Sequence, residues 1–381
     1  MQKKHFSLSA NPARIIAGSF LGVIITGTLL LMLPLSAKNG AVTNFFDALF
    51  TATSATCVTG LIVVDTYAHW TFFGQGVILS LIQIGGLGLV TLTLFFNLLI
   101  RRKLGLRTLQ LAQESTSASN FEDTPRLLRG IVGISLTVEA IGAVLLLPAF
   151  VPKYGMEGIF ISVFTSVSAF CNAGFDLLGR EGPYSSLIHY NGSYVLLVVS
   201  ALIIIGGLGF MVLFDLLHYH KSKKLRLHSR VVLLSTACLL FIGTLGFAAL
   251  EWHNPATMGN LPVWQKLNAA FFQSVSTRTA GFNSIDIASM NEISKVLSIG
   301  LMFIGAAPGS TGGGIKVTTI VVLIMTAVSV ARGYDDTIIM KHKIKRQVVN
   351  KSLTVVFIGF LAVLLASGVI IYTTHDGGVT A

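Results

Sequence analysis

Long stretches with almost no charged residues recur along this chain. Each is long enough to cross the ~30 Å hydrocarbon core of a bilayer as a helix, which takes roughly 20 residues. Seven such stretches occur, at 15–35, 72–100, 130–150, 193–217, 231–250, 296–331 and 353–373. Only 11% of the residues are charged, against about a quarter in soluble domains. Because a helix satisfies its own backbone polar groups in lipid, the sequence predicts an all-α integral membrane protein.

Positive charge is distributed unevenly over the connections between these stretches. Alternate connections hold most of the basic residues, namely Lys3, Lys4, Arg14, Arg101, Arg102, Lys103, Arg107, Arg126, Arg129, Lys221, Lys223, Lys224, Arg226, Arg230, Arg332, Lys341, Lys343, Lys345, Arg346 and Lys351. Cytoplasmic loops are enriched in Lys and Arg, so this pattern predicts a multi-pass protein of the cell membrane with a cytoplasmic N-terminus. The basic loops suit anionic membrane lipid or an acidic cytosolic partner, and no nucleic-acid partner is expected.

One segment occurs three times without gaps, beginning with Phe and ending with Gly. The copies are FTATSATCVTG at 50–60, FTSVSAFCNAG at 164–174 and FFQSVSTRTAG at 271–281. Their last glycines are separated by 114 and then 107 residues, the length of a two-span unit. A second motif follows in the same order, as IGGLG at 84–88, IGGLG at 205–209 and IGAAPG at 304–309. Repeats at this period predict a pseudo-symmetric assembly whose axis passes through the repeated segment.

A short, partly apolar segment precedes each of these glycines, at 44–56, 158–170 and 266–277. Each contains about 12–13 residues, too few to cross a membrane as a helix. We therefore expect re-entrant helices, each followed by an extended strip that lines a water-filled cavity. The negative C-terminal end of each helix favours a cation, and strip carbonyls can replace an ion's hydration shell. The alternative, ordinary polar turns between hairpins, does not account for three ungapped copies.

These motifs resemble those of the Trk/Ktr/HKT superfamily of potassium transporters, most closely its Ktr-type membrane subunits. The residues that carry the resemblance are CVTGL at 57–61 with VVDT after it, CNAGFD at 171–176, TAGFNS at 279–284 and APGSTGGGIKVTT at 307–319. The resemblance covers nearly the whole chain and implies fused helix–pore-loop–helix units around a central ion pore. It implies three filter strips whose backbone carbonyls bind K⁺: Thr56, Cys57, Val58, Thr59 and Gly60; Phe170, Cys171, Asn172, Ala173 and Gly174; Thr277, Arg278, Thr279, Ala280 and Gly281.

The stretch 296–331 is interrupted by IGAAPGSTGGGIKVTT at 304–319. Gly309 and Gly314 have Walker spacing, but Ile315 separates Gly314 from Lys316, which breaks the phosphate-binding pattern. A continuous helix here would be about 54 Å long at 1.5 Å per residue, so it must tilt or break. By resemblance the loop is a gate below the filter, formed by Ala307, Pro308, Gly309, Ser310, Thr311, Gly312, Gly313, Gly314 and Lys316. Lys316 either pairs with a carboxylate or loop carbonyls, or extends from a helix end toward water.

The repeats divide the chain into residues 1–126, 127–228 and 229–340, with 341–381 as the first helix of a fourth unit. No fourth pore loop follows before Ala381, so we expect either a truncated chain or a second polypeptide that completes the pore. The resemblance further implies a homodimer and a cytosolic nucleotide-binding ring as partners. No cofactor is expected in this chain; K⁺ is the transported ion, with Na⁺ dependence allowed by analogy.

A few polar residues stand out inside or beside the apolar stretches. Glu139 is expected to be paired or to face a cavity, because an ionised carboxylate is costly in a membrane. Arg278 is expected to point away from the pore and to bond to backbone or to an acid behind the filter. Asp65 and Asp176 follow the strips and either concentrate cations at the mouth or are ordinary solvated carboxylates.

Two other classes of function remain as alternatives. A secondary cation symporter built from broken-helix repeats predicts inverted repeats and ionisable residues at the midplane, whereas these copies run in one orientation. An intramembrane enzyme would need a nucleophile with a base or metal at matched depth. The sequence offers no such constellation, so no enzymatic activity is expected.

Overall fold

The computed structural model describes residues 12–88, 91, 124–182 and 184–376, and this part of the chain is mostly helical. Its elements are α1 (Pro12–Leu31), η1 (Pro34–Ser36), α2 (Phe45–Thr56), α3 (Thr66–His69), α4 (Phe72–Leu87), α7 (Thr124–Tyr154), α8 (Glu157–Phe170), η2 (Ile188–Tyr190), α9 (Val195–Leu208), α10 (Phe210–Ser222), α11 (Leu227–Glu251), α12 (Val263–Ser276), α13 (Glu292–Phe303), α14 (Val317–Ala331), β1 (Ile338–Ile339), β2 (His342–Lys343) and α15 (Arg346–Asp376).

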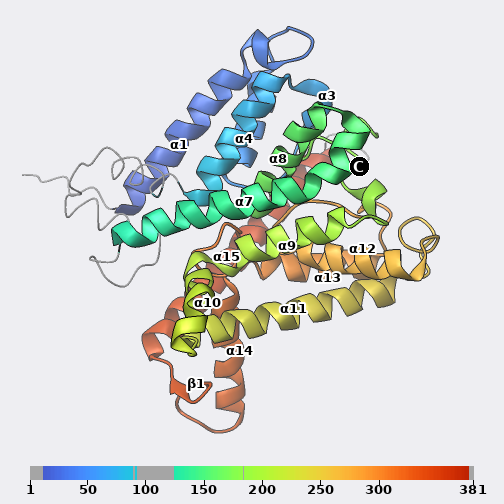
Figure 1. Cartoon of the computed structure of the whole chain (residues 1–381). Helices are drawn as coiled ribbons and strands as arrows, with labels where there is room; N and C mark the ends of the chain where they lie inside the picture. The colour runs from blue at the N-terminus through green and yellow to red at the C-terminus, as the bar shows by residue number, and fades with distance from the viewer. Residues whose placement is uncertain (1–11, 89–90, 92–123, 183, 377–381) are drawn as a thin grey trace, which may run out of the picture.

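Three short helices, α2, α8 and α12, occupy the segments expected to be re-entrant. Each packs against the long helix that precedes it, namely α1, α7 and α11 respectively. α8 and α12 both also contact α9, and α4 contacts α2 and α8, so neighbouring units share helices in the interior. Figure 1 shows α8, α9 and α12 inside an outer set that includes α1, α7 and α11. The all-α membrane fold is thus confirmed, whereas the unit boundaries at 126, 228 and 340 stay a prediction.

Four helices of the described residues are long and apolar enough to cross a membrane: they lie at 14–31, 127–154, 227–251 and 346–373. The expected span at 72–100 is helical to Leu87, and most of its remainder lies outside the described residues. The stretch 296–331 is broken between α13 and α14, as its proline and glycines predict. The seven expected stretches therefore do not all form continuous spanning helices within the described residues.

The expected span at 193–217 is wrong as a single straight helix. α9 and α10 meet at Gly209 with a bend of 99°. Gly209 has a φ of +87°, a backbone conformation that strongly favours glycine. A methyl group at this position would also lie 2.7 Å from the carbonyl oxygen of Pro308. The break therefore makes room for the loop between α13 and α14.

The last helix, α15, differs from the others in its surroundings. None of its apolar window is buried within the chain, and its main helix contact is with α14. Between α14 and α15 lies an antiparallel pair, β1 and β2, with Ile338 opposite Lys343. Apolar side chains that are exposed all round are typical of a helix in lipid. The length and apolar character of α15 are those of a membrane-crossing helix.

Candidate ion-conduction site

The three strips that follow α2, α8 and α12 have the same backbone conformation. In each, the residue two positions before the final glycine has a left-handed φ: +57° at Val58, +58° at Asn172 and +66° at Thr279. The final glycines are also left-handed, at +79° for Gly60, +73° for Gly174 and +86° for Gly281. Non-glycine residues adopt such angles rarely and at a cost. The repeated sequence therefore specifies a repeated, non-helical backbone path.

The three final glycines meet at one point. A methyl group at Gly60 would lie 2.7 Å from the carbonyl oxygen of Ala173, and one at Gly174 would lie 2.6 Å from that of Ala280. A methyl group at Gly281 would lie 3.1 Å from the Cα of Gly174 and 3.5 Å from the Cα of Gly60. Only glycine permits this approach. The structure thus brings together strips that are more than 100 residues apart in sequence.

Most carbonyl groups of the strips are left unpaired, and Phe170 O is the exception among the described residues. Within the described part of the chain no hydrogen bond reaches the carbonyl oxygens of Cys57–Gly60, Cys171–Gly174 or Thr277–Gly281. Nearly all buried carbonyls in proteins have a partner, so the unpaired carbonyls of the second strip, whose residues are buried, call for one. The strips also extend from the C-terminal, partially negative ends of three helices. Their chemistry suits a cation that has lost part of its hydration shell.

Hydrogen bonds back to the pore helices hold the strips in place. The N–H of Thr59 donates to Ser54 O at 2.9 Å, and that of Ala173 donates to Ser168 O at 2.8 Å. In the third copy the corresponding N–H of Ala280 donates to Ser276 O at 2.9 Å. The N–H groups thus face the supporting helices, which leaves the carbonyls available elsewhere.

A cavity of about 350 Å³ lies at the glycine end of the strips. Gly60, Gly174 and Gly281 line it together with Asp65 and Asp176. Asp65 accepts hydrogen bonds from Ala68 N at 2.7 Å and Tyr184 N at 3.1 Å, so it is tied to the backbone of two loops. Burial raises the pKa of Asp176 to about 6, although Leu178 N donates to its carboxylate. Both acids thus line this cavity, which we call the vestibule, and both also form hydrogen bonds with the protein backbone.

The loop at 304–316 contacts the opposite end of the strips. The hydroxyl of Thr311 donates to Phe170 O at 2.9 Å, and the N–H of Gly313 donates to the hydroxyl of Thr279 at 3.1 Å. A methyl group at Gly312 would lie 3.0 Å from the side-chain amide of Asn172. The loop therefore touches both the second and the third strips, on the side away from the vestibule.

The break between α9 and α10 anchors the same loop. Ala307 N donates to Gly207 O at 3.0 Å, Thr311 N donates to Gly206 O at 3.2 Å, and Phe210 N donates to Gly309 O at 2.9 Å. The loop is closed on itself by Gly305 N, which donates to Ile315 O at 3.0 Å. Ser310 Oγ donates to Ala307 O within the loop. The loop is thus an ordered structure that is bonded to the second and third strips and to the break between α9 and α10.

The two basic residues of the site have partners that only the structure reveals. Lys316 Nζ donates to Gly312 O at 2.8 Å, so its partner is a loop carbonyl. Arg278 is buried, with 6% exposed, but its guanidinium reaches the hydroxyl of Thr236 at 3.5 Å. The expectation that Arg278 bonds to backbone or to an acid is therefore wrong among the described residues. Its Nε has no partner there.

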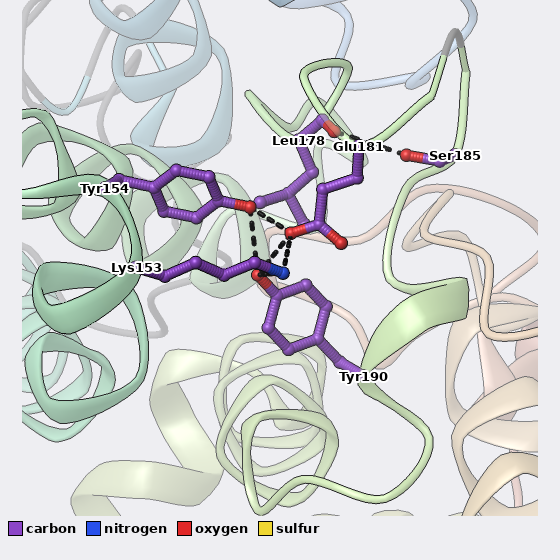
Figure 2. Close-up of polar contacts among 6 residues, drawn as sticks. All are labelled: Lys153, Tyr154, Leu178, Glu181, Ser185 and Tyr190. Carbon is purple, nitrogen blue, oxygen red and sulfur yellow. Dashed lines mark hydrogen bonds and ion pairs between the residues drawn. The ribbon is translucent and has the colours of Figure 1, made fainter.

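A polar cluster outside the second strip holds the vestibule wall to the end of α7 (Figure 2). Glu181 accepts hydrogen bonds from Lys153, Tyr154 and Tyr190, the last at 2.8 Å. Burial opposes ionisation of Glu181, but these hydrogen bonds and the positive charge of Lys153 outweigh it and lower its pKa. Ser185 Oγ donates to Leu178 O at 3.2 Å within the same loop. The cluster thus fixes a segment that follows the second strip.

Sequence reasoning missed the partner of Glu139. Gln83 Nε2 donates to both carboxylate oxygens of Glu139 at 3.1 Å each. A polar residue inside the apolar stretch 72–100 was the available signal.

Among the described residues no group of three or more His, Cys, Asp and Glu side chains could hold a metal ion. A cation at this site would depend on backbone oxygens.

Comparison with known proteins agrees with this geometry. A family described as "TrkH: Cation transport protein" matches residues 2–377. The chain belongs to the TrkH family. It is therefore a membrane cation transporter, with the helical fold of that family.

Individual relatives in the TrkH family carry more specific names. The "Ktr system potassium uptake protein B" of Bacillus subtilis is 41% identical over 357 residues, which cover 92% of this chain and 79% of the relative. The "Potassium/sodium uptake protein NtpJ" of Enterococcus hirae is 39% identical over 359 residues, covering 94% and 78%. The crystal structure of the potassium transporter TrkH from Vibrio parahaemolyticus matches with a TM-score of 0.70 at 20% identity, covering 100% of this chain and 75% of that one.

Proposed function

We propose that this chain is the ion-translocating subunit of a K⁺ uptake system, with a carbonyl filter and a gate. The observation that carries the proposal is the meeting of three left-handed, glycine-ended strips. Within the described residues, the carbonyl oxygens of Cys57–Gly60, Cys171–Gly174 and Thr277–Gly281 are unpaired. Rings of backbone carbonyls that replace the hydration shell are how K⁺ filters work. The names of the Bacillus and Enterococcus relatives, a potassium uptake protein and a potassium/sodium uptake protein, support the same ion.

The gate in this proposal is the loop from Ala307 to Lys316. Its hydrogen bonds to Phe170 O and to the hydroxyl of Thr279 support this role, because the loop lies at the inner end of two strips. An ion that leaves the filter toward the cytoplasm would meet it next. Lys316, bonded to Gly312 O, stabilises the closed form by tying the end of the loop to its middle.

The membrane orientation and the partners in this proposal are supported by charge. Basic residues gathered in alternate connections support a cytoplasmic N-terminus and would provide a surface for anionic lipid and for a cytosolic nucleotide-binding ring. A Ktr system has more than one component by name, which supports such a regulatory subunit. Dimerisation is part of the same proposal. The name of the Enterococcus relative supports a test of Na⁺ dependence as well.

Reconstitution of the full-length protein into liposomes tests the proposal. A K⁺ gradient directed into the liposomes should drive K⁺ uptake. An equal Na⁺ gradient should not drive a comparable uptake of Na⁺. Folded, monodisperse protein that carries no K⁺ would contradict the proposal. K⁺ uptake that requires a Na⁺ gradient would instead favour a secondary symporter.

A further inference from the structure

Glu139 is a buried carboxylate that the proposed filter and gate do not use. It lies in α7, inside a membrane-spanning stretch, with 5% of its surface exposed. Within the described residues it forms no ion pair, and its partner is the amide of Gln83 from α4. Placing a carboxylate in a membrane interior is costly and commonly marks a functional role. The question is what this carboxylate acts on.

The side chain next to the Glu139–Gln83 pair is that of Cys171, a residue of the second strip. Cys171 Sγ lies 3.9 Å from Glu139 Oε1 and 3.9 Å from Gln83 Oε1. Cys171 is fully buried. A methyl group at Gly86 would lie 2.5 Å from its sulfur, so the backbone of α4 packs directly against it. The thiol is thus enclosed between helices of the first and second units.

Glu139 also belongs to the frame that holds the pore helix α8. The hydroxyl of Ser166 donates to Glu139 O at 2.7 Å, and a methyl group at Gly142 would lie 2.4 Å from that hydroxyl. α7 therefore contacts the pore helix through the backbone of Glu139 and the strip through its side chain. One residue links both supports of the second strip.

The third unit repeats this frame without the carboxylate. There the hydroxyl of Ser274 donates to Leu240 O at 3.0 Å, and a methyl group at Gly243 would lie 2.3 Å from it. Leu240 thus occupies the place of Glu139. Because a leucine suffices for packing at that place, the fold itself does not require the acid in α7. The acid is present behind the second strip and absent from the corresponding place behind the third.

We propose that Glu139 is a positioning residue for the filter, which with Gln83 fixes Cys171 and thereby the carbonyl path of the second strip. This rests on the proposed function, because it assigns a selectivity role within that filter. The second strip lies between the other two: a methyl group on Gly60 would approach Ala173, and one on Gly174 would approach Ala280. A shift of the second strip therefore displaces both neighbouring strips. Discrimination between K⁺ and Na⁺ then depends on the backbone path of the second strip, which Glu139 and Gln83 fix through Cys171.

Three variants of the full-length protein in liposomes test the inference. Glu139→Leu copies the third unit and removes the polar contact, and should lower the K⁺-over-Na⁺ flux ratio by about tenfold. Glu139→Gln keeps a hydrogen-bonding group and should retain the ratio within about threefold. Cys171→Ala should lower the ratio as Glu139→Leu does, and the double variant should lose little more, because both act through one contact. Leu240→Met is the matched control at the third unit.

The outcomes separate this inference from the proposed function. If the unaltered protein carries K⁺ selectively but Glu139→Leu and Cys171→Ala leave the ratio unchanged, Glu139 is only a packing residue and the inference is wrong. If Glu139→Leu does not fold, the same decision falls on Cys171→Ala and Gln83→Leu. A protein that carries no K⁺ at all would instead contradict the proposed function.

Discussion

The hydroxyl of Thr311 donates a hydrogen bond to the carbonyl oxygen of Phe170 at 2.9 Å, so the loop between α13 and α14 is bonded to the first residue of the second strip. The proposed gate and the proposed filter are therefore in direct contact. A movement of the loop away from the strip must break this bond. In the proposed mechanism, opening of the gate and release of the Phe170 carbonyl would then be one event.

Replacement of Thr311 by valine should favour the open loop. Valine has a similar shape but no donor, and a net hydrogen bond is worth about 0.5–1.5 kcal/mol, so K⁺ flux should rise by up to about tenfold. Flux into liposomes under a fixed gradient measures this. Ser310→Ala is the control, because Ser310 bonds only to Ala307 O inside the loop. Equal effects of the two variants would remove the special role of Thr311.

Removal of Gly312 to Gly314 should open the path more strongly. This segment contacts the side chains of Asn172 and Thr279, so a shorter loop cannot reach across. K⁺ flux should increase well beyond that of the unaltered protein. Gly313→Ala keeps the loop length and meets no atom within 4 Å, so it serves as the control. If the shortened loop left flux unaltered, the loop would not be a barrier.

Replacement of Gly174 by valine should relax selectivity. A Cβ there would lie 2.6 Å from Ala280 O, and its φ of +73° strains any β-branched residue. Strain of about 1–3 kcal/mol should displace the strip and lower K⁺-over-Na⁺ discrimination by about tenfold or more. Gly300→Ala, in α13 with open space around it, is the matched control. Unchanged discrimination in a folded variant would mean that this strip does not contact the ion.

Acid should weaken the wall beside the vestibule through Glu181. Its pKa is lowered in the folded protein, so the stability that it contributes is present above the ordinary glutamate pKa and is lost as the pH falls through the lower folded value. In that acid range, the thermal stability of purified Glu181→Gln should depend less on pH than that of the unaltered protein. Identical acid profiles for both proteins would contradict this.

The helices and the strips were predictable because they follow repeated local sequence. A short segment before each of the three glycines predicted α2, α8 and α12, and Pro308 with its neighbouring glycines predicted the break in the stretch 296–331. These features depend on the length of each segment, its apolar character and the backbone freedom of its residues. All three can be read from a short stretch of sequence.

Contacts between units were not predictable. The bend at Gly209 lies in a stretch that is apolar throughout, and it forms because the loop from another unit approaches there. The motif IGGLG contained a signal, since Gly88 and Gly209 share a left-handed φ. The partners of Glu139 and Arg278, which are Gln83 and Thr236, lie on helices far away in sequence. Side-chain partners across units need three-dimensional placement.

The central claim is that carbonyl oxygens of the three strips bind a dehydrated monovalent cation where Gly60, Gly174 and Gly281 meet. Crystals of the full-length protein grown with Rb⁺ or Tl⁺ in place of K⁺ test it by anomalous scattering. The account predicts anomalous peaks on the axis between the strips, within coordination distance of their carbonyl oxygens. Strips that converge with no peak between them at saturating ion, or peaks only at carboxylates elsewhere, would contradict it.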